Sequence, residues 1–112
     1  MQPILLVLIT CPDRASAEKI AEALVERQFA ACVNLIPGLT SVYRWGGKIE
    51  KDQEVLLMAK TTQPAFAALK DCIIKLHPAD LPEIIGLPVQ TGLAGYLQWV
   101  SDETISAPSS PE

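Results

Sequence analysis

Histidine is almost absent from this sequence, which contains only His77. A serine–histidine–aspartate set cannot be argued from one histidine without a motif around it. Gly46-Gly47 lacks the G-x-x-x-x-G-K-[ST] pattern of a phosphate-binding loop. Nine Lys and Arg against 13 Asp and Glu give a formal net charge of −4, which argues against a dedicated nucleic-acid binder. The sequence therefore predicts no enzyme and no nucleic-acid partner.

Cysteines are few and scattered. Cys11, Cys32 and Cys72 lie far apart, and none belongs to a C-x-x-C pair. An odd, dispersed set fits a reducing cytoplasm better than a disulfide framework. The apolar start, MQPILLVLIT, follows no basic residue and is too short for a membrane span. We therefore expect a buried first strand over Ile4–Thr10, a cytoplasmic location and no membrane partner.

The chain has the length and composition of one packed domain. Its 112 residues are 49% apolar, enough to bury roughly 65% of the unfolded surface. We predict a single domain over residues 1–103. The end of the chain, TISAPSSPE, is rich in serine and proline, so residues 104–112 are expected to form a disordered tail.

Residues 31–62 predict a long β-hairpin. Gly46-Gly47 suits a two-residue turn with positive φ at both positions. Counting from that turn places Trp45 opposite Lys48 and Tyr43 opposite Glu50. The arms are rich in β-branched, aromatic and aliphatic residues, as strands are. Pro37-Gly38 interrupts the first arm, which predicts a bulge that bends the hairpin.

The predicted hairpin is long for so small a domain. An arm of about 13 residues, at roughly 3.3 Å each, extends on the order of 40 Å. A compact chain of this length has a diameter of only roughly 35 Å. The hairpin is therefore expected to project beyond its own domain. An isolated ribbon is marginal in water, and its free edges invite pairing. We infer that it docks on neighbouring copies of the same chain.

Two helices are predicted from periodicity. Asp13 is the expected N-cap of a first helix over Arg14–Gln28, with Gln28 on its apolar face. The second helix is expected to begin near Thr62-Gln63-Pro64 and to stop before His77-Pro78.

One more strand and a last helix complete the pattern. The apolar run Ile84–Val89 predicts a strand, and Gly92 is expected to open a short helix. The order β-α-β-β-α-β followed by a short helix is that of an α+β, ferredoxin-like fold. In that fold, two helices cover one face of a four-stranded antiparallel sheet.

Short motifs lie along the chain in a fixed order. They are Thr10-Cys11-Pro12-Asp13, Ala30-Ala31-Cys32-Val33-Asn34, Ser41-Val42-Tyr43-Arg44-Trp45, Gly47-Lys48-Ile49-Glu50, Lys60-Thr61, His77-Pro78, Leu81-Pro82-Glu83-Ile84 and Tyr96-Leu97-Gln98-Trp99-Val100. With these motifs the chain resembles the CutA family of divalent-cation tolerance proteins, over about residues 4 to 101. The resemblance implies a ferredoxin-like protomer, a PII-like homotrimer built through the long hairpin, and a link to copper tolerance.

The metal candidates are His77 and Cys11. In a bacterial relative, metal binding is associated with a cysteine at the end of the first strand and a His-His pair. Those positions here are Ile9, Leu76 and His77, so one of the three ligands is kept, and Cys11 is a candidate substitute. Imidazole and thiol are suitable ligands for copper. The alternatives are a His77 that satisfies carbonyls at a helix C-terminus and a Cys11 that is a small buried hydrophobe.

Six residues are candidates for clefts between protomers: Cys32, Tyr43, Trp45, Glu50, Lys60 and Glu83. Lys60 and the glutamates, Glu54 among them, could bind a small ligand or form intersubunit ion pairs. We favour ion pairs, because charges at interfaces commonly set register. The two aromatics are interpreted first as trimer packing.

Two functions follow as hypotheses. The first is a non-enzymatic, cytoplasmic homotrimer of metal-ion response that binds divalent copper weakly and holds no tight cofactor. The second is a PII-like signalling protein that binds a small metabolite in clefts between protomers.

Overall fold

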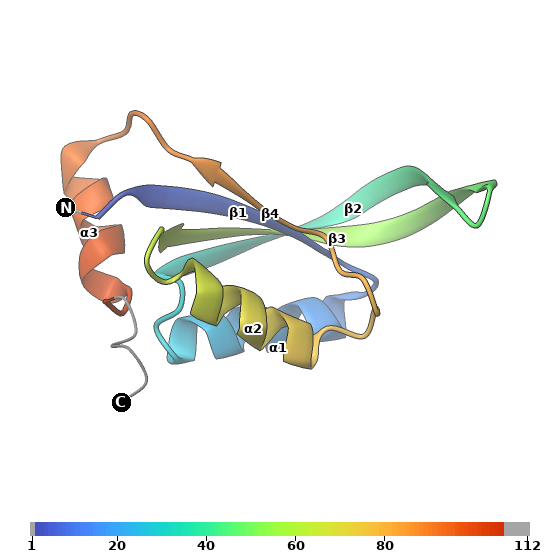
Figure 1. Cartoon of the computed structure of the whole chain (residues 1–112), viewed down its shortest axis with the longest axis horizontal. Helices are drawn as coiled ribbons and strands as arrows, with labels where there is room; N and C mark the ends of the chain where they lie inside the picture. The colour runs from blue at the N-terminus through green and yellow to red at the C-terminus, as the bar shows by residue number, and fades with distance from the viewer. Residues whose placement is uncertain (1, 107–112) are drawn as a thin grey trace.

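The computed structural model describes residues 2–106, which form seven elements. They are β1 (Ile4–Cys11), α1 (Arg14–Glu26), β2 (Cys32–Trp45), β3 (Lys48–Thr62), α2 (Phe66–Leu76), β4 (Ile84–Pro88) and α3 (Ala94–Glu103). The strands form one antiparallel sheet in the order β2-β3-β1-β4. Helices α1 and α2 lie together on one face, and α3 lies at the end away from the hairpin tip (Figure 1). The predicted α+β, ferredoxin-like arrangement is confirmed.

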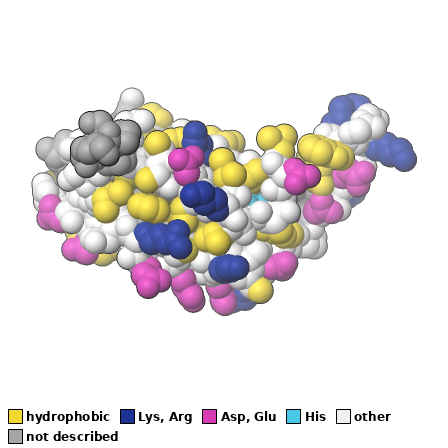
Figure 2. All heavy atoms as spheres, turned by 60° about the horizontal axis from the view of Figure 1, so that its bottom comes forward, with side chains coloured by type: hydrophobic (Ala, Val, Ile, Leu, Met, Phe, Trp, Pro, Cys, Tyr) yellow, Lys and Arg dark blue, Asp and Glu magenta, His cyan; other side chains and the backbone are white. Residues whose placement is uncertain are grey.

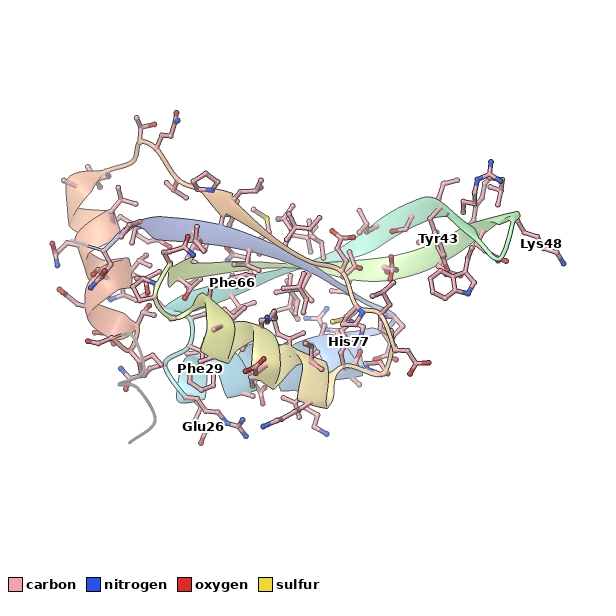
Figure 3. The ribbon with its side chains drawn as sticks, in the orientation of Figure 1. Glu26, Phe29, Tyr43, Lys48, Phe66 and His77 are labelled. Carbon is pink, nitrogen blue, oxygen red and sulfur yellow. The ribbon has the colours of Figure 1, made fainter. Side chains whose placement is uncertain are left out.

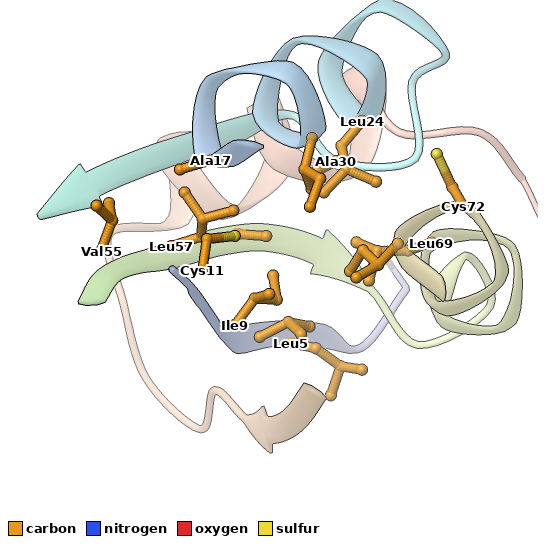
Figure 4. Close-up of a cluster of buried hydrophobic side chains, with 14 residues drawn as sticks. Leu5, Ile9, Cys11, Ala17, Leu24, Ala30, Val55, Leu57, Leu69 and Cys72 are labelled. Atoms are coloured by element: carbon orange, nitrogen blue, oxygen red, sulfur yellow. The ribbon is translucent and has the colours of Figure 1, made fainter. Parts of the chain in front are cut away.

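The core fills the space between the sheet and the two long helices. Strand residues alternate between faces, so every second side chain of β1 and β3 is buried against the helices. The buried set includes Leu5, Val7, Ile9, Cys11, Val55, Leu57 and Ala59 from the strands, and Ile20, Leu24, Leu69 and Ile73 from the helices (Figure 4). This packing makes β1 and β3 a rigid platform, from which the hairpin extends.

Helix α1 begins as the sequence predicts and ends two residues early. The Ser16 amide donates to Asp13 Oδ1 at 2.7 Å, the N-cap bond. This backbone hydrogen bond lowers the pKa of Asp13. The prediction that Gln28 continues the apolar face is wrong, because Gln28 has φ +60° and is exposed. The Phe29 and Ala30 amides both donate to the Leu24 carbonyl, which closes the helix and turns the chain into β2.

The hairpin has the predicted register. Trp45 pairs with Lys48 and Tyr43 with Glu50, around a turn in which Gly46 and Gly47 have φ +58° and +78°. The register shifts between Ile36 and Leu39, which confirms the bulge predicted at Pro37-Gly38. The bulge lies where the hairpin leaves the sheet, so it influences the direction of the tip.

The hairpin also projects as predicted. The molecule measures 44 × 36 × 25 Å, with a radius of gyration of 14.7 Å. A compact domain of this length has a radius of gyration of about 13 Å. The tip extends beyond the body and carries basic, acidic and apolar side chains together (Figure 2). Val42, Trp45 and Ile49 are 60%, 60% and 62% exposed there.

The last elements differ slightly from their predicted bounds. Strand β4 ends at Pro88, and α3 begins at Ala94 rather than at Gly92. A Cβ atom added at Gly92 would lie 3.1 Å from the Leu97 side chain. Beyond α3, the Thr104 hydroxyl donates to the Val100 carbonyl at 2.7 Å. The last six residues of the predicted tail, 107–112, lie outside the described residues.

None of the helices within residues 2–106 combines the length and the apolar character that a membrane crossing needs.

Candidate functional site

His77 lies at the C-terminal end of α2, and hydrogen bonds occupy both of its ring nitrogens. The Ala79 amide donates to Nδ1 at 3.0 Å, and Nε2 lies 2.7 Å from the Thr10 carbonyl oxygen. Because Nδ1 accepts a hydrogen bond, Nε2 must carry the hydrogen of the neutral ring, and it donates a hydrogen bond to the Thr10 carbonyl oxygen. The imidazole thus ties the α2–β4 loop to the end of β1. Neither nitrogen presents a free lone pair to a metal.

Cys11 belongs to the core. It is the last residue of β1, it has no exposed surface, and it packs with Ala17, Val55 and Leu57. Burial raises the pKa of the Cys11 thiol to about 11, although a hydrogen bond with Ser16 opposes the shift. The hydrogen bond of His77 Nε2 is made with the backbone carbonyl of the neighbouring Thr10. Within residues 2–106, no three His, Cys, Asp or Glu side chains are grouped to hold a metal ion.

We therefore predict that Cys11 is a slow thiol. In a chain carrying Cys32→Ser and Cys72→Ser, Cys11 should react with a disulfide reagent at pH 8 at least about 100-fold more slowly than in urea, because the thiolate is the nucleophile. Since the folded pKa is raised from 9.0 to about 11, the folded chain holds a proton that the unfolded chain loses. Stability should therefore fall between about pH 9 and 11. Equal labelling rates in the folded and unfolded chains would contradict this placement.

The six predicted cleft residues lie in two places. Tyr43, Trp45 and Glu83 line one hollow, and Glu50 is the cross-strand partner of Tyr43. Cys32 and Lys60 instead face each other at the other end of the hairpin ladder. There, the Lys60 ammonium donates to Asn34 Oδ1. One chain therefore does not bring the six residues together.

The hollow has a volume of about 550 Å³ and lies between the hairpin and the α2–β4 loop. Its wall comes from the end of β1, from β2 and β3 and from the loop: Thr10, Ser41, Val42, Tyr43, Trp45, Glu54, Ala79, Asp80, Leu81 and Glu83. His77 lies at the start of that loop, and Tyr43 lies on the hairpin (Figure 3). The bond from His77 to Thr10 therefore fixes one wall of the hollow relative to the other.

Sequence reasoning missed Asp80 and Leu81 as lining residues. The available signal was the pair of prolines, Pro78 and Pro82, which bracket a short loop directly after α2. Proline fixes φ, so such a loop has few conformations. Its position beside the hairpin depends on tertiary packing and has no sequence signal.

Tyr43 has a carboxylate partner within the hairpin. Its hydroxyl donates to Asp52 Oδ2. This bond, together with the negative charge of Asp52, raises the pKa of Tyr43 to about 12. The phenol is therefore protonated at any physiological pH.

The sheet order, the projecting hairpin and the loop-lined hollow define a class of small ferredoxin-like proteins with an extended β2–β3 ribbon. A family model described as "CutA1 divalent ion tolerance protein" matches residues 5–103. The chain belongs to this family.

Relatives support the assignment along most of the chain. It is 52% identical to a divalent-cation tolerance protein CutA of Thermus thermophilus over 98 residues, 88% of this chain and 95% of the relative. It is 50% identical to the human protein CutA over 102 residues, 91% of this chain but 57% of the human protein. The solved Thermus thermophilus structure superimposes with a TM-score of 0.89 at 50% identity, covering 90% of this chain and 98% of that one.

Proposed function

We propose that the protein is a non-enzymatic homotrimer of the metal-ion tolerance response. The observation that carries the proposal is the projecting hairpin, whose Val42, Trp45 and Ile49 are exposed in a single chain. Large apolar side chains on a projecting ribbon are costly in water, whereas contact with a second copy would bury them. The family resemblance supports three copies, and three copies in head-to-tail contact form a closed ring when each is rotated by a third of a turn.

The uncovered face of the sheet supports the same assembly. The alternation that buries Leu57 places Leu56, Met58, Leu6 and Leu8 on the opposite face. Ile36, Ile85 and Leu87 extend that face and are 44%, 48% and 43% exposed. Helices α1 and α2 lie on the other face (Figure 1), and α3 covers this one only at its end, where Val100 packs with the buried Ile4. Interfaces of obligate oligomers are apolar and resemble a domain core cut in half. An apolar sheet face of this kind is therefore suited to pack against another copy of the chain.

Sedimentation equilibrium at low micromolar protomer tests the assembly. The expected result is a single species of three times the chain mass. A folded species of one chain mass would overturn the proposal, since the exposed ribbon would then need no partner.

The metal part of the proposal is weak divalent copper binding. The donors of one chain do not form a ready site, because His77 must exchange the Ala79 amide for the metal and Cys11 must ionise within the core. Both steps reduce affinity, whereas a closed metal site has its ligands in place. Copper bound by this chain is therefore expected to exchange readily. Ready exchange suits a role in metal tolerance better than permanent binding as a cofactor would.

A copper titration tests this directly. We expect a dissociation constant weaker than about 10 µM, and a further loss of at least about fivefold in His77→Ala. Cys11→Ser should weaken copper binding less than His77→Ala does, because the raised pKa of the buried thiol opposes its ionisation and so limits its part in binding. A tight site, or one that is unaffected by His77→Ala, would contradict the assignment of His77.

The second candidate function is that of a small-metabolite sensor. The hollow of about 550 Å³ beside the hairpin favours it, because ligand sites are typically concave and of this size. For either function we propose a cytoplasmic location, since the three cysteines are free thiols, as in a reducing compartment. Cell fractionation with an antibody to the chain tests this location.

A further inference from the structure

We propose that His77 is a conformational switch, through which copper binding releases the α2–β4 loop from the body of the domain. This inference rests on the copper binding proposed above and specifies its consequence for the chain. Three observations lead to it: the ring nitrogen that is left for a metal, the group that occupies this nitrogen, and the small number of bonds that hold the loop.

The Thr10 carbonyl determines which ring nitrogen can bind a metal. Nε2 of His77 donates to this oxygen, with 2.7 Å between the two atoms, so the lone pair of the neutral ring is on Nδ1. A metal-bound imidazole typically donates its other N–H to a backbone carbonyl or a carboxylate, which orients the ring. The bond to Thr10 therefore fits a metal on Nδ1 and does not have to break.

The Ala79 amide occupies Nδ1. Its N–H donates to this nitrogen at 3.0 Å. A lone pair that accepts a hydrogen bond cannot bind a metal at the same time, so the metal and the amide compete for one atom. Copper on Nδ1 therefore separates Ala79 from the ring. Ala79 is exposed, so water can replace the imidazole as the acceptor of the freed N–H.

His77 holds the loop almost alone. Within residues 2–106, the segment 78–82 makes no hydrogen bond other than that of the Ala79 amide, and no ion pair. Packing within the chain adds little, because residues 78–81 are exposed and Leu81 is 74% exposed. Once the Ala79 bond is lost, the segment is tethered only where it joins α2 and β4. Ala79, Asp80 and Leu81 line the hollow, so their release also changes one wall of it.

Hydrogen exchange measured by mass spectrometry tests the release on the full-length protein. Only Ala79, Asp80 and Leu81 carry amides between Pro78 and Pro82. With saturating copper(II) chloride, the Ala79 amide should exchange at least about fivefold faster than without metal, because its acceptor is lost. Amides of the buried part of β3 should not change. His77→Ala should give the fast exchange at Ala79 with or without copper.

A proline substitution tests which nitrogen binds the metal. Proline has no N–H, so in Ala79→Pro nothing competes with copper for Nδ1, and the affinity should rise at least about threefold. Asp80→Pro is the matched control, because it restricts the same loop and keeps the Ala79 N–H. Its copper affinity should stay within about twofold of that of the parent chain.

Copper binding that depends on His77 but leaves the exchange at Ala79 unchanged would overturn the inference and leave the proposed function intact. Slow exchange at Ala79 in His77→Ala would overturn it too, since the loop would then be held by other contacts. So would an unchanged affinity in Ala79→Pro, since copper would then not compete with the amide. An absence of copper binding would overturn both the inference and the metal part of the proposed function, whereas the trimer is measured separately.

Discussion

Replacing Val42 and Ile49 together by aspartate is expected to convert the proposed trimer into single chains. Both side chains lie on the projecting hairpin, 60% and 62% exposed in one chain. Burial of a large aliphatic side chain contributes about 2 kcal/mol, so two residues in each of three copies contribute on the order of 10 kcal/mol per trimer. Buried aspartates would add a desolvation cost. Sedimentation equilibrium and thermal unfolding at fixed protomer concentration would measure the loss.

A matched variant on the helical layer controls for the added charge. Val25 of α1 and Ile74 of α2 are also exposed, at 42% and 53%, but lie on the two helices rather than on the hairpin. Val25→Asp with Ile74→Asp should leave the trimer intact. If both double variants dissociate alike, the hairpin is not the specific contact.

Replacing Leu57 by alanine is expected to lower the free energy of unfolding by about 2–5 kcal/mol per chain, because it leaves a cavity in a packed core. Leu57 has no exposed surface and pairs with Ile9 on one side and Leu35 on the other. It therefore joins β1 to the hairpin. Urea unfolding at one protomer concentration measures the loss, since the stability of an oligomer depends on concentration.

Ile74→Ala is the control for Leu57→Ala. Ile74 is more than half exposed on α2, so its truncation should cost less than about 1 kcal/mol. Equal losses for the two variants would mean that the sheet–helix interface is not the main source of stability.

The sequence was most informative where local chemistry decides the structure. Gly46-Gly47 set the hairpin register, because positive φ at two successive positions selects a two-residue turn. Asp13 set the start of α1 through one side-chain bond. The end of α1 was misjudged at Gln28, because the bonds that close the helix are made by backbone amides and carry little sequence signal.

The candidate site was less predictable than the fold. His77 was recognised as a potential ligand, but its engagement by Thr10 and Ala79 depends on strand β1, 67 residues away in the sequence. For Cys11 the sequence left two alternatives, a metal ligand and a small buried hydrophobe, and the structure shows it buried in the core with residues of α1 and β3. In one chain, Tyr43, Trp45 and Glu83 line one hollow, whereas Lys60 and Cys32, predicted for the same clefts between protomers, lie at the other end of the hairpin.

By itself, the sequence determined the order of the elements and the length and register of the hairpin. Several short motifs in a fixed order also indicated the family. Turn residues, caps and apolar periodicity act over a few residues, so they can be read along the chain. Only the tertiary structure decided that both nitrogens of His77 are engaged, that the Cys11 thiol is enclosed, and that an acidic loop faces the aromatic side of the hairpin. These relations join segments far apart in sequence, and packing of the whole domain is the physical cause of each.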